Sequence, residues 1–371
     1  MKSVATPLKP ATEGIKYAGS KLRLIPQILE LARKTGAGSV FDGFSGTTRV
    51  SQAFAQNGYR VVANDVAVWS KVFAECYLLN DKTPDYFEPL IDHLNGLKGK
   101  DGWFTKHYGG DGSAKSSISS DGLKKPFQIH NMRKLDAIRE EIDSLPIDAY
   151  DRSVLITSLI LALDRVDNTL GHFVSYLNQW SDRSFGELHL RVPKLNPTPG
   201  FHTVLQEDAS KAASNTDTEL AYFDPPYGSN NEKMPPSRVR YASYYHFWST
   251  VVLNDKPEIF GKAKRREDSS DRVAASKFED FRRSDDGKFL AVEAIENLLL
   301  NTSSPQIILS YSSKGRATAE ALVDAIESIG EITEFVKIDH RKNVMAGMRW
   351  TNAWIPEDDS KNQEFLFLIQ K

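Results

Sequence analysis

Two short apolar segments separated by a helix-compatible stretch constrain the fold of this sequence most strongly. The segments span residues 39–44 and 60–65, and residues 48–57 lie between them. A strand, a helix and a second strand in this order predict two parallel strands joined by a crossover. Both segments end in small or acidic residues, at the sheet edge where α/β proteins bind ligands. The sequence therefore predicts an open α/β sheet with a site at that edge.

Five further apolar segments bring the expected number of strands to about seven. Between them, residues 81–200 show helical periodicity, chiefly at 131–143 and 152–163. Residues 228–287 are polar and aromatic, with one helix expected around 243–253. The five segments are 202–206, 219–224, 305–311, 332–338 and 364–370.

These boundaries predict a sheet domain in two parts. The expected first part is 1–80, a mainly helical insertion follows at 81–200, and the second part is 201–371, with long loops at 228–287.

The composition excludes several classes of protein. The chain has 371 residues, of which 40% are hydrophobic and 26% charged, close to the average of folded soluble proteins. No apolar run reaches the ~20 residues of a membrane span, and the amino-terminus lacks a secretory signal. The single cysteine excludes an internal disulfide, and no spacing resembles a metal site. We expect a cytoplasmic protein without metal or membrane partner, whose net charge of −2 requires local basic patches for any binding to nucleic acid.

An apolar strand that stops at two prolines is the segment most directly connected with chemistry. Residues 221–228 read Ala-Tyr-Phe-Asp-Pro-Pro-Tyr-Gly. Pro225 and Pro226 cannot donate hydrogen bonds to a sheet, and they hold the backbone rigidly as it leaves the strand. Asp224, the Pro225 carbonyl and Tyr227 would then be displayed together. The alternative is that the prolines end the strand and Tyr227 packs internally.

These groups suit chemistry on an aromatic amino group. Such a nitrogen is a weak nucleophile because its lone pair is delocalised into the ring. If the Asp224 carboxylate and the Pro225 carbonyl each accept one of its hydrogens, the lone pair can be directed at a methyl donor. Tyr227 would provide a stacking face for a base rotated out of a duplex.

Residues 224–227 resemble the DPPY motif of DNA amino-group methyltransferases, and the chain is similar to the adenine-N6 group that includes the Dam and DpnII-type enzymes. The resemblance implies a Rossmann-like class I methyltransferase sheet with a mainly helical target-recognition insertion. It also implies methyl transfer from S-adenosylmethionine to N6 of adenine in double-stranded DNA, with a cognate restriction endonuclease as a candidate partner. The catalytic residues implied are Asp224, Pro225, Pro226 and Tyr227.

Two further segments are similar to the cofactor motifs of this family. Residues 16–21 resemble its first motif, and residues 40–46 resemble its acidic, glycine-rich loop. Gly43 stands where proline is usual, and Thr48 where a second glycine is common. A solvated lysine turn and the nucleotide-binding loop of a dehydrogenase are the alternatives. The implied cofactor contacts are Tyr17, Lys21, Asp42, Gly43, Phe44, Ser45 and Gly46.

Acidic residues at later strand ends complete the expected cofactor site. A carboxylate at Asp65 is placed to accept hydrogen bonds from ribose hydroxyls. Asp208 and Ala209 match the family position beside the cofactor adenine, and Asp224 borders the same site. For Asp65 and Asp208 the alternative is capping of the next helix.

Basic and polar side chains suited to DNA occur in three places. Lys16 and Lys21 lie in the first motif, and the resemblance places sequence reading in the insertion. There, residues 164–172 are polar directly after a long apolar helix. After residue 228, basic and aromatic residues alternate. The expected contacts in the last two stretches are Arg165, Asn168, Thr169, His172, Arg238, Arg240, Tyr244, Lys264 and Arg265.

Alternatives remain for these stretches and for the reaction. Residues 164–172 could cap a helix, the basic cluster at 262–266 could be a solvated loop, and Phe247 is interpreted as a core residue. Cytosine-N4 relatives usually carry Ser in place of Asp224, and RNA or protein-glutamine relatives usually carry Asn. Cytosine-C5 chemistry needs a cysteine usually after proline, whereas Cys76 follows glutamate. A DNA-binding relative without catalysis is the remaining alternative.

Overall fold

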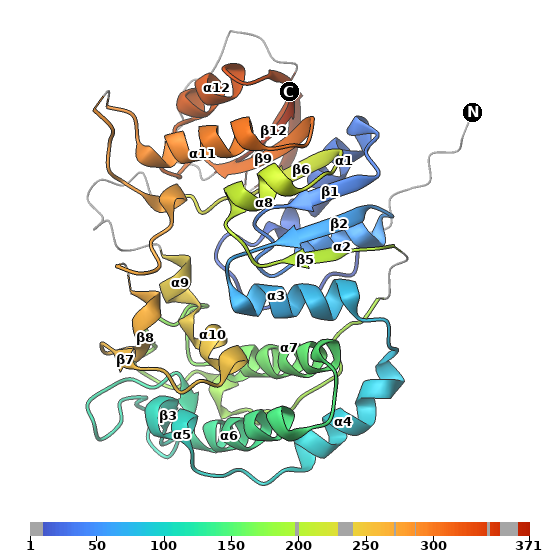
Figure 1. Cartoon of the computed structure of the whole chain (residues 1–371). Coiled ribbons are helices and arrows are strands. Elements are labelled where there is room, and N and C mark those ends of the chain that lie inside the picture. Colours follow the sequence, from blue (N-terminus) through green and yellow to red (C-terminus); the bar gives the residue numbers. More distant parts are fainter. Residues whose placement is uncertain are drawn as a thin grey trace.

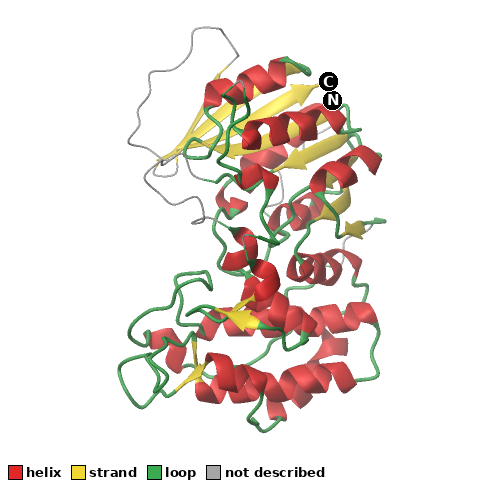
Figure 2. Cartoon of the chain, turned by 60° about the vertical axis from the view of Figure 1, so that its left-hand side comes forward, coloured by secondary structure: helices red, strands yellow, loops and turns green. Residues whose placement is uncertain are grey.

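The computed structural model describes residues 10–196, 200–228, 240–270, 272–285, 287–339, 342–348 and 363–371. An eight-stranded sheet and a mainly helical unit make up this part of the chain (Figure 1). Figure 2 shows the long strands gathered in one lobe and the helices of the insertion in the other. Arg238, an expected DNA contact, lies outside the described residues.

The large sheet has the strand order β11-β10-β12-β9-β6-β1-β2-β5. All seven expected strands occur, and the structure adds β11, which pairs antiparallel with β10. The five strands from β9 to β5 run parallel, whereas β12 lies antiparallel between β9 and β10. The α/β fold expected from the sequence is therefore confirmed. The strands are β1 (Ser39–Asp42), β2 (Arg60–Asn64), β5 (Thr203–Leu205), β6 (Leu220–Phe223), β9 (Gln306–Ser312), β10 (Glu331–Asp339), β11 (Lys342–Met348) and β12 (Gln363–Gln370).

Helices cover both faces of the sheet, so its central strands are buried on both sides. Successive residues of β1 point to opposite faces, so Val40 packs with α1 and α2 while Phe41 packs with α8, α11 and α12. These helices are α1 (Ile25–Thr35), α2 (Arg49–Gln56), α8 (Ala209–Asn215), α11 (Leu290–Asn301) and α12 (Ala319–Glu327).

The helical unit is built around one long buried helix, α7 (Ala149–Val166). Asp148 caps this helix by accepting hydrogen bonds from the N–H groups of Tyr150 and Asp151. Residues 153–163 are all buried. No helix in the described ranges is long and apolar enough to cross a membrane. The unit also contains α3 (Val68–Ala74), a π-helical turn (Glu75–Leu79), α4 (Pro84–Gly96), α5 (Trp103–Tyr108) and α6 (Ile129–Ser144).

The segment that follows β6 joins this helical unit. It forms α9 (Tyr241–Tyr244) and α10 (His246–Leu253). Phe247 is fully buried and stacks on Phe173 with 4.8 Å between ring centroids, which confirms its interpretation as a core residue. The buried Arg139 of α6 donates to the Val251 carbonyl at 2.6 Å and thereby holds the end of α10. The structure thus confirms a helix within residues 243–253 and places it in the core of the helical unit.

Several short elements complete the described part of the chain. Two small sheets pair β3 (Gly109–Gly110) with β4 (Phe127–Gln128) and β7 (Ile259–Phe260) with β8 (Arg265–Arg266). Single 3-10 turns lie at Lys21–Arg23, Asp182–Phe185, Glu267–Ser269 and Lys277–Glu279.

The replacement Phe247→Ala tests whether α10 belongs to the core of the helical unit. It should lower the free energy of unfolding by about 3–5 kcal/mol, because it removes a fully buried ring and leaves a cavity. Urea unfolding followed by circular dichroism measures this loss. Phe201→Ala is the control, since Phe201 is 93% exposed, and should change the stability by less than about 0.5 kcal/mol. Equal small effects for both variants would contradict the assignment.

Candidate active site

A cavity of about 850 Å³ lies at the carboxyl ends of the parallel strands. Residues that follow four strands line it: Gly43 and Phe44 after β1, Asp65 after β2, Asp208 after β5 and Asp224 after β6. β1 pairs with β2 on one side and β6 on the other, so the cavity lies where the chain connections diverge. The structure therefore brings together residues that were expected to form one site from four separate segments.

The loop after β1 is closed by hydrogen bonds to the end of β2. The Ser45 N–H donates to the Asn64 carbonyl at 2.9 Å, and the Gly46 N–H donates to Asp65 at 2.8 Å. Thr48, which stands where the family commonly has glycine, has a φ of 60° and so adopts the left-handed conformation that glycine adopts without strain. Asp42 lies buried beneath this loop, where it accepts a hydrogen bond from the Ser51 hydroxyl at 2.5 Å.

Burial dominates the electrostatics of the two carboxyls around this loop. It raises the pKa of Asp42 to about 7, although the bond from Ser51 opposes the shift. Burial also raises the pKa of Asp65, against the backbone N–H groups of Ala67 and Gly46 that favour its charged form. Asp65 lines the cavity, whereas Asp42 is absent from its lining.

Gly43 is tightly enclosed. Its N–H donates to the Tyr222 carbonyl at 3.0 Å, and a Cβ at this position would lie 2.7 Å from the Phe223 ring. Proline, which is usual here in the family, would lose this hydrogen bond and contact the ring. Glycine in place of the usual proline at position 43 therefore leaves room for the Phe223 ring in this chain.

Asp208 borders the opposite end of the cavity and also caps a helix. Its carboxylate accepts hydrogen bonds from the N–H groups of Ser210 and Lys211 at the start of α8. Lys277 forms an ion pair with it at 3.3 Å, and the neighbouring Phe278 ring packs edge-on against Phe44. Ala209 lines the cavity next to this carboxylate. Lys277 and Phe278 thus form a wall that sequence reasoning missed, because the polar segment around them carries no periodic signal.

Aromatic rings form the wall between the sheet and the helical unit. Tyr17 stacks on Tyr245 with 4.7 Å between centroids and lies 5.5 Å from the Tyr241 ring. Tyr17 and Tyr241 both line the cavity. The first motif therefore reaches this cavity through Tyr17, as the resemblance implies for that residue.

A buried ion cluster lies at the end of β6. The Lys21 ammonium lies 2.9 Å from Asp224 Oδ1 and 3.0 Å from Glu364 Oε1. The side chains of Lys21 and Glu364 are only 5% and 3% exposed, whereas Asp224 is 18% exposed. Glu364 was not expected in the site. The one available signal was a carboxylate at the start of an otherwise apolar strand.

Burial raises the pKa of Asp224 to about 6, with the nearby Glu364 adding to the shift and the Lys21 ammonium opposing it. Burial alone would lower the pKa of Lys21, but the two carboxylates raise it above its ordinary value. Lys21 is therefore charged at neutral pH, and Asp224 is mostly ionised.

Tyr227 belongs to the ion cluster. Its hydroxyl oxygen lies within hydrogen-bonding distance of Asp224 Oδ1 and, at 2.5 Å, of Glu364 Oε1, so its single hydrogen is shared between the two carboxylates. The Lys21 ammonium lies 4.6 Å above its ring, and the Tyr311 ring lies 4.7 Å away. Pro226 lines the cavity beside Asp224, but Pro225 and Tyr227 do not. The expected stacking face of Tyr227 is therefore occupied by Lys21 in this arrangement.

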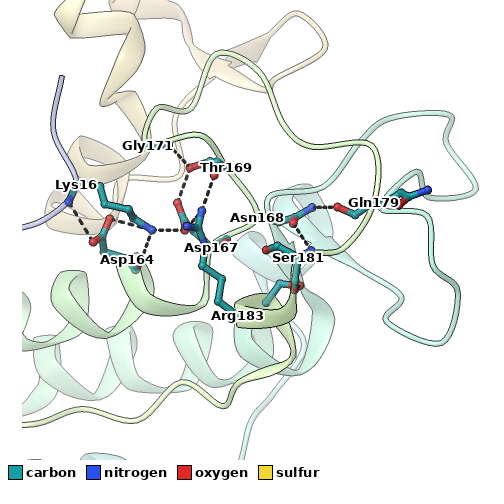
Figure 3. Close-up of polar contacts among 10 residues, drawn as sticks. Lys16, Asp164, Asp167, Asn168, Thr169, Gly171, Gln179, Ser181 and Arg183 are labelled. Carbon is teal, nitrogen blue, oxygen red and sulfur yellow. Dashed lines mark hydrogen bonds and ion pairs between the residues drawn. The ribbon is translucent and has the colours of Figure 1, made fainter. Parts of the chain in front are cut away.

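Lys16 connects the first motif to the end of α7 (Figure 3). Its ammonium lies 2.6 Å from Asp167 Oδ1 and donates to the Asp164 carbonyl at 2.5 Å. Arg183 forms a second ion pair with Asp167. The positive charge of Lys16, an expected DNA contact, is thus compensated within the chain.

The polar turn after α7 is held by its own side chains. The buried Asn168 amide donates to the Gln179 carbonyl and accepts from the Ser181 N–H, and Thr169 donates to Asp167 (Figure 3). These bonds correspond to the turn-lining alternative for Asn168 and Thr169. The adjacent Leu170 is 74% exposed.

The remaining expected DNA contacts within the described residues differ in their exposure. The half-buried His172 stacks on Tyr244 with 4.7 Å between centroids, so the structure joins two stretches that are distant in sequence. Arg165 is exposed at the end of α7, and Arg240 is buried. Arg265 donates to the Ser243 hydroxyl of α9 at 2.9 Å, and Lys264 precedes it in the turn before β8.

Across the described ranges, no group of three or more His, Cys, Asp or Glu side chains is arranged to hold a metal ion.

Comparisons with known proteins agree with this geometry. The family model for D12 class N6 adenine-specific DNA methyltransferases matches residues 17–303. The modification methylase StsI of Streptococcus sanguinis is 28% identical over 96% of this chain and 52% of its own length. The type II methyltransferase M.FokI of Planomicrobium okeanokoites is 25% identical over 96% and 53%. The type II methyltransferase M.NlaIII of Neisseria lactamica is 26% identical over 88% and 92%. The chain thus spans about half the length of the first two relatives.

The replacement Gly43→Ala tests the close contact between the loop and β6. It should lower the free energy of unfolding by about 1–3 kcal/mol, because the added methyl group forces Phe223 to move. Denaturant unfolding measures the change. Gly96→Ala is the control, since nothing lies within 4 Å of a Cβ at that position, and it should not destabilise the protein. A loss no larger than that of the control would show that the enclosure is loose.

Proposed function

Since the chain belongs to the family of D12 class N6 adenine-specific DNA methyltransferases, we propose that it methylates N6 of adenine at a specific site in double-stranded DNA. The observation that carries this proposal is the Asp224 carboxylate, which ends β6, lines the cavity and is held by Lys21. The expectation drawn from the DPPY-like segment is confirmed at the level of the family.

Asp224 would hold the reacting amino group. Its Oδ1 accepts hydrogen bonds from Lys21 and Tyr227, whereas Oδ2 has no hydrogen-bond partner among the described residues. Oδ2 is therefore available for one hydrogen of the amine, and the Pro225 carbonyl would accept the other. With both hydrogens held, the lone pair of the nitrogen is directed away from the base ring.

The charge of the cluster favours the reaction. Two carboxylates share one ammonium, which leaves one net negative charge beside the amine. That charge stabilises the positive charge that develops on the nitrogen as its bond to carbon forms. Asp224 also accepts the amine proton more readily because its pKa is raised to about 6.

The residues around the cavity fit S-adenosylmethionine, which when bound supplies the electrophilic methyl group. The cavity has the size of a pocket for a nucleotide-sized molecule. Phe44 offers an apolar ring, and the Asp65 and Asp208 carboxylates offer acceptors for ribose hydroxyls or the adenine amino group. Tyr17 and Phe278 close the cavity from two sides.

We assign DNA contact to the surface side chains around α9 and the end of α7. His172 and Tyr244 form a stacked aromatic pair there, and Arg165 and Arg265 supply positive charge for phosphates. The buried Lys21 is instead assigned to Asp224. Because the relative StsI is named a modification methylase, we extend the proposal to the modification half of a restriction-modification system, with a cognate endonuclease as partner.

Label transfer to duplex DNA tests the proposed function. Duplex DNA is incubated with the protein and with cofactor that carries a tritiated methyl group, and is then digested to nucleosides. Label should appear in N6-methyladenine. Label found only in methylcytosine, or in RNA but never in DNA, would refute the proposal.

The variant Asp224→Ala should lose methyl transfer by about 10³-fold or more, because the principal acceptor for the amine is removed. Cofactor binding, measured by calorimetry, should remain, since the carboxylates of Asp65 and Asp208 are intact. Asp217→Ala, at an exposed position before β6, is the control and should keep full activity. Turnover near that of the control in Asp224→Ala would contradict the assigned role.

The pH dependence should show an acid limb near pH 6. Protonation removes the negative charge of Asp224 and makes it a much weaker acceptor for the amine, so the rate should fall about tenfold per pH unit below its pKa. Single-turnover rates between about pH 5 and pH 8 measure this limb. Asp42→Asn is the control, because Asp42 has a pKa of about 7 but lies beneath the loop. Disappearance of the limb in that variant would assign it to Asp42.

A further inference from the structure

Glu364 is a buried carboxylate for which neither the sequence motifs nor the family supplies a role. It is the second residue of β12, far from the matched segment 17–303. Its side chain is 3% exposed, and a buried carboxylate is unfavourable unless it is paired and hydrogen-bonded. The groups around it therefore indicate why the fold tolerates it.

Three donors converge on one oxygen of Glu364. Oε1 lies 3.0 Å from the Lys21 ammonium, 2.5 Å from the Tyr227 hydroxyl and 2.9 Å from the Ser310 hydroxyl. The first two donors are also the two that bind Asp224 Oδ1. Glu364 and Asp224 thus share the donors Lys21 and Tyr227. The contacts with both carboxylates together hold each of these side chains in place.

We propose that Glu364 is a positioning residue that anchors Lys21 and Tyr227 so that Asp224 presents its Oδ2 to the target amino group. Glu364 does not itself line the cavity, and it acts through the two donors. This inference rests on the proposed function, because it assigns Asp224 the role of holding that amine.

The shared ammonium has a second consequence for Asp224. Without the charge of Glu364, Lys21 would pair with Asp224 alone and would neutralise it more completely. Asp224 would then be a weaker acceptor for the hydrogen of an amine. The observed arrangement keeps the acceptor strong while it fixes the plane of the carboxylate.

Titratable groups on the neighbouring elements bear on this balance. The phenols around the two carboxylates have pKa values raised by burial and remain neutral. Asp42 of β1 interacts with Asp224, and the carboxylates of Asp65 and Glu279 act on the neighbouring phenols of Tyr17 and Tyr241. The cation that contacts both carboxylates is Lys21. The phenols are Tyr17, Tyr222, Tyr227 and Tyr241.

Two variants separate the effect of the charge of Glu364 from the effect of its side-chain length. Glu364→Gln keeps the shape and removes the charge, so kcat should fall about 10- to 100-fold and the acid limb of the pH profile should move to lower pH. Glu364→Asp keeps the charge but shortens the side chain by one methylene. Its kcat should fall by a similar factor while the acid limb stays in place. The KM for DNA should change in neither variant.

Glu331→Gln is the matched control, because Glu331 is an exposed glutamate at the start of β10 in the same sheet. It should alter neither kcat nor the acid limb. Wild-type kcat in Glu364→Gln would overturn the proposal. So would a loss of kcat in Glu364→Gln with an unmoved acid limb, because a purely structural carboxylate would give that result.

A measurement that needs no turnover keeps this inference distinct from the proposed function. The pKa of Asp224, followed by carboxyl carbon NMR, should be lower in folded Glu364→Gln than in the wild type. An unchanged pKa would overturn the positioning role even if the wild type methylates adenine. Failure of the wild type to methylate DNA, together with the lowered pKa, would instead refute the function and leave the coupling between the two carboxylates established.

Discussion

A single buried ammonium connects three distant parts of this chain. Lys21 comes from the amino-terminal motif, Asp224 from the end of β6 and Glu364 from β12. The Lys21 ammonium lies 2.9 Å from Asp224 Oδ1 and 3.0 Å from Glu364 Oε1. Because a buried ammonium without partners is strongly unfavourable, the amino-terminal segment must pack against this edge of the sheet. That packing brings Tyr17 to the cavity and Lys16 to the end of α7. The arrangement of the site therefore depends on satisfying one charge.

The two structural units meet through contacts of different kinds. On the sheet side, the Ser45 and Gly46 N–H groups of the loop after β1 donate to the Asn64 carbonyl and the Asp65 carboxylate at the end of β2. Toward the helical unit, Tyr17 stacks on Tyr245, and Lys16 forms ion pairs at the end of α7. α10 follows β6 in the chain but packs in the helical core. The segment that bears Asp224 is thus continuous with both units, which places the Asp224 carboxylate at their junction.

Local patterns in the sequence were sufficient for the seven strands and for the edge that carries the site. Apolar runs that carry Asp42, Asp65 or Asp224 near their carboxyl ends predict strand ends, and parallel strands bring such ends together. β11 and Glu364 could not be found in this way. The pairing of β11 is a tertiary contact with β10, and the partners of Glu364 lie 343 and 137 residues away in Lys21 and Tyr227. Likewise, Asn168 and Thr169 look like free polar side chains until the loop that saturates them is known.

The turn held by Asn168 and Thr169 carries an exposed apolar side chain on a fixed backbone. Internal hydrogen bonds order residues 167–171 before any partner arrives, and Leu170 projects from them into solvent. Ordering one residue on binding costs about 1–2 kcal/mol of conformational entropy. A partner that contacts Leu170 would bind a turn that is already ordered, so this cost in conformational entropy would not be added on binding. The polar residues of this turn thus fix the backbone that presents Leu170.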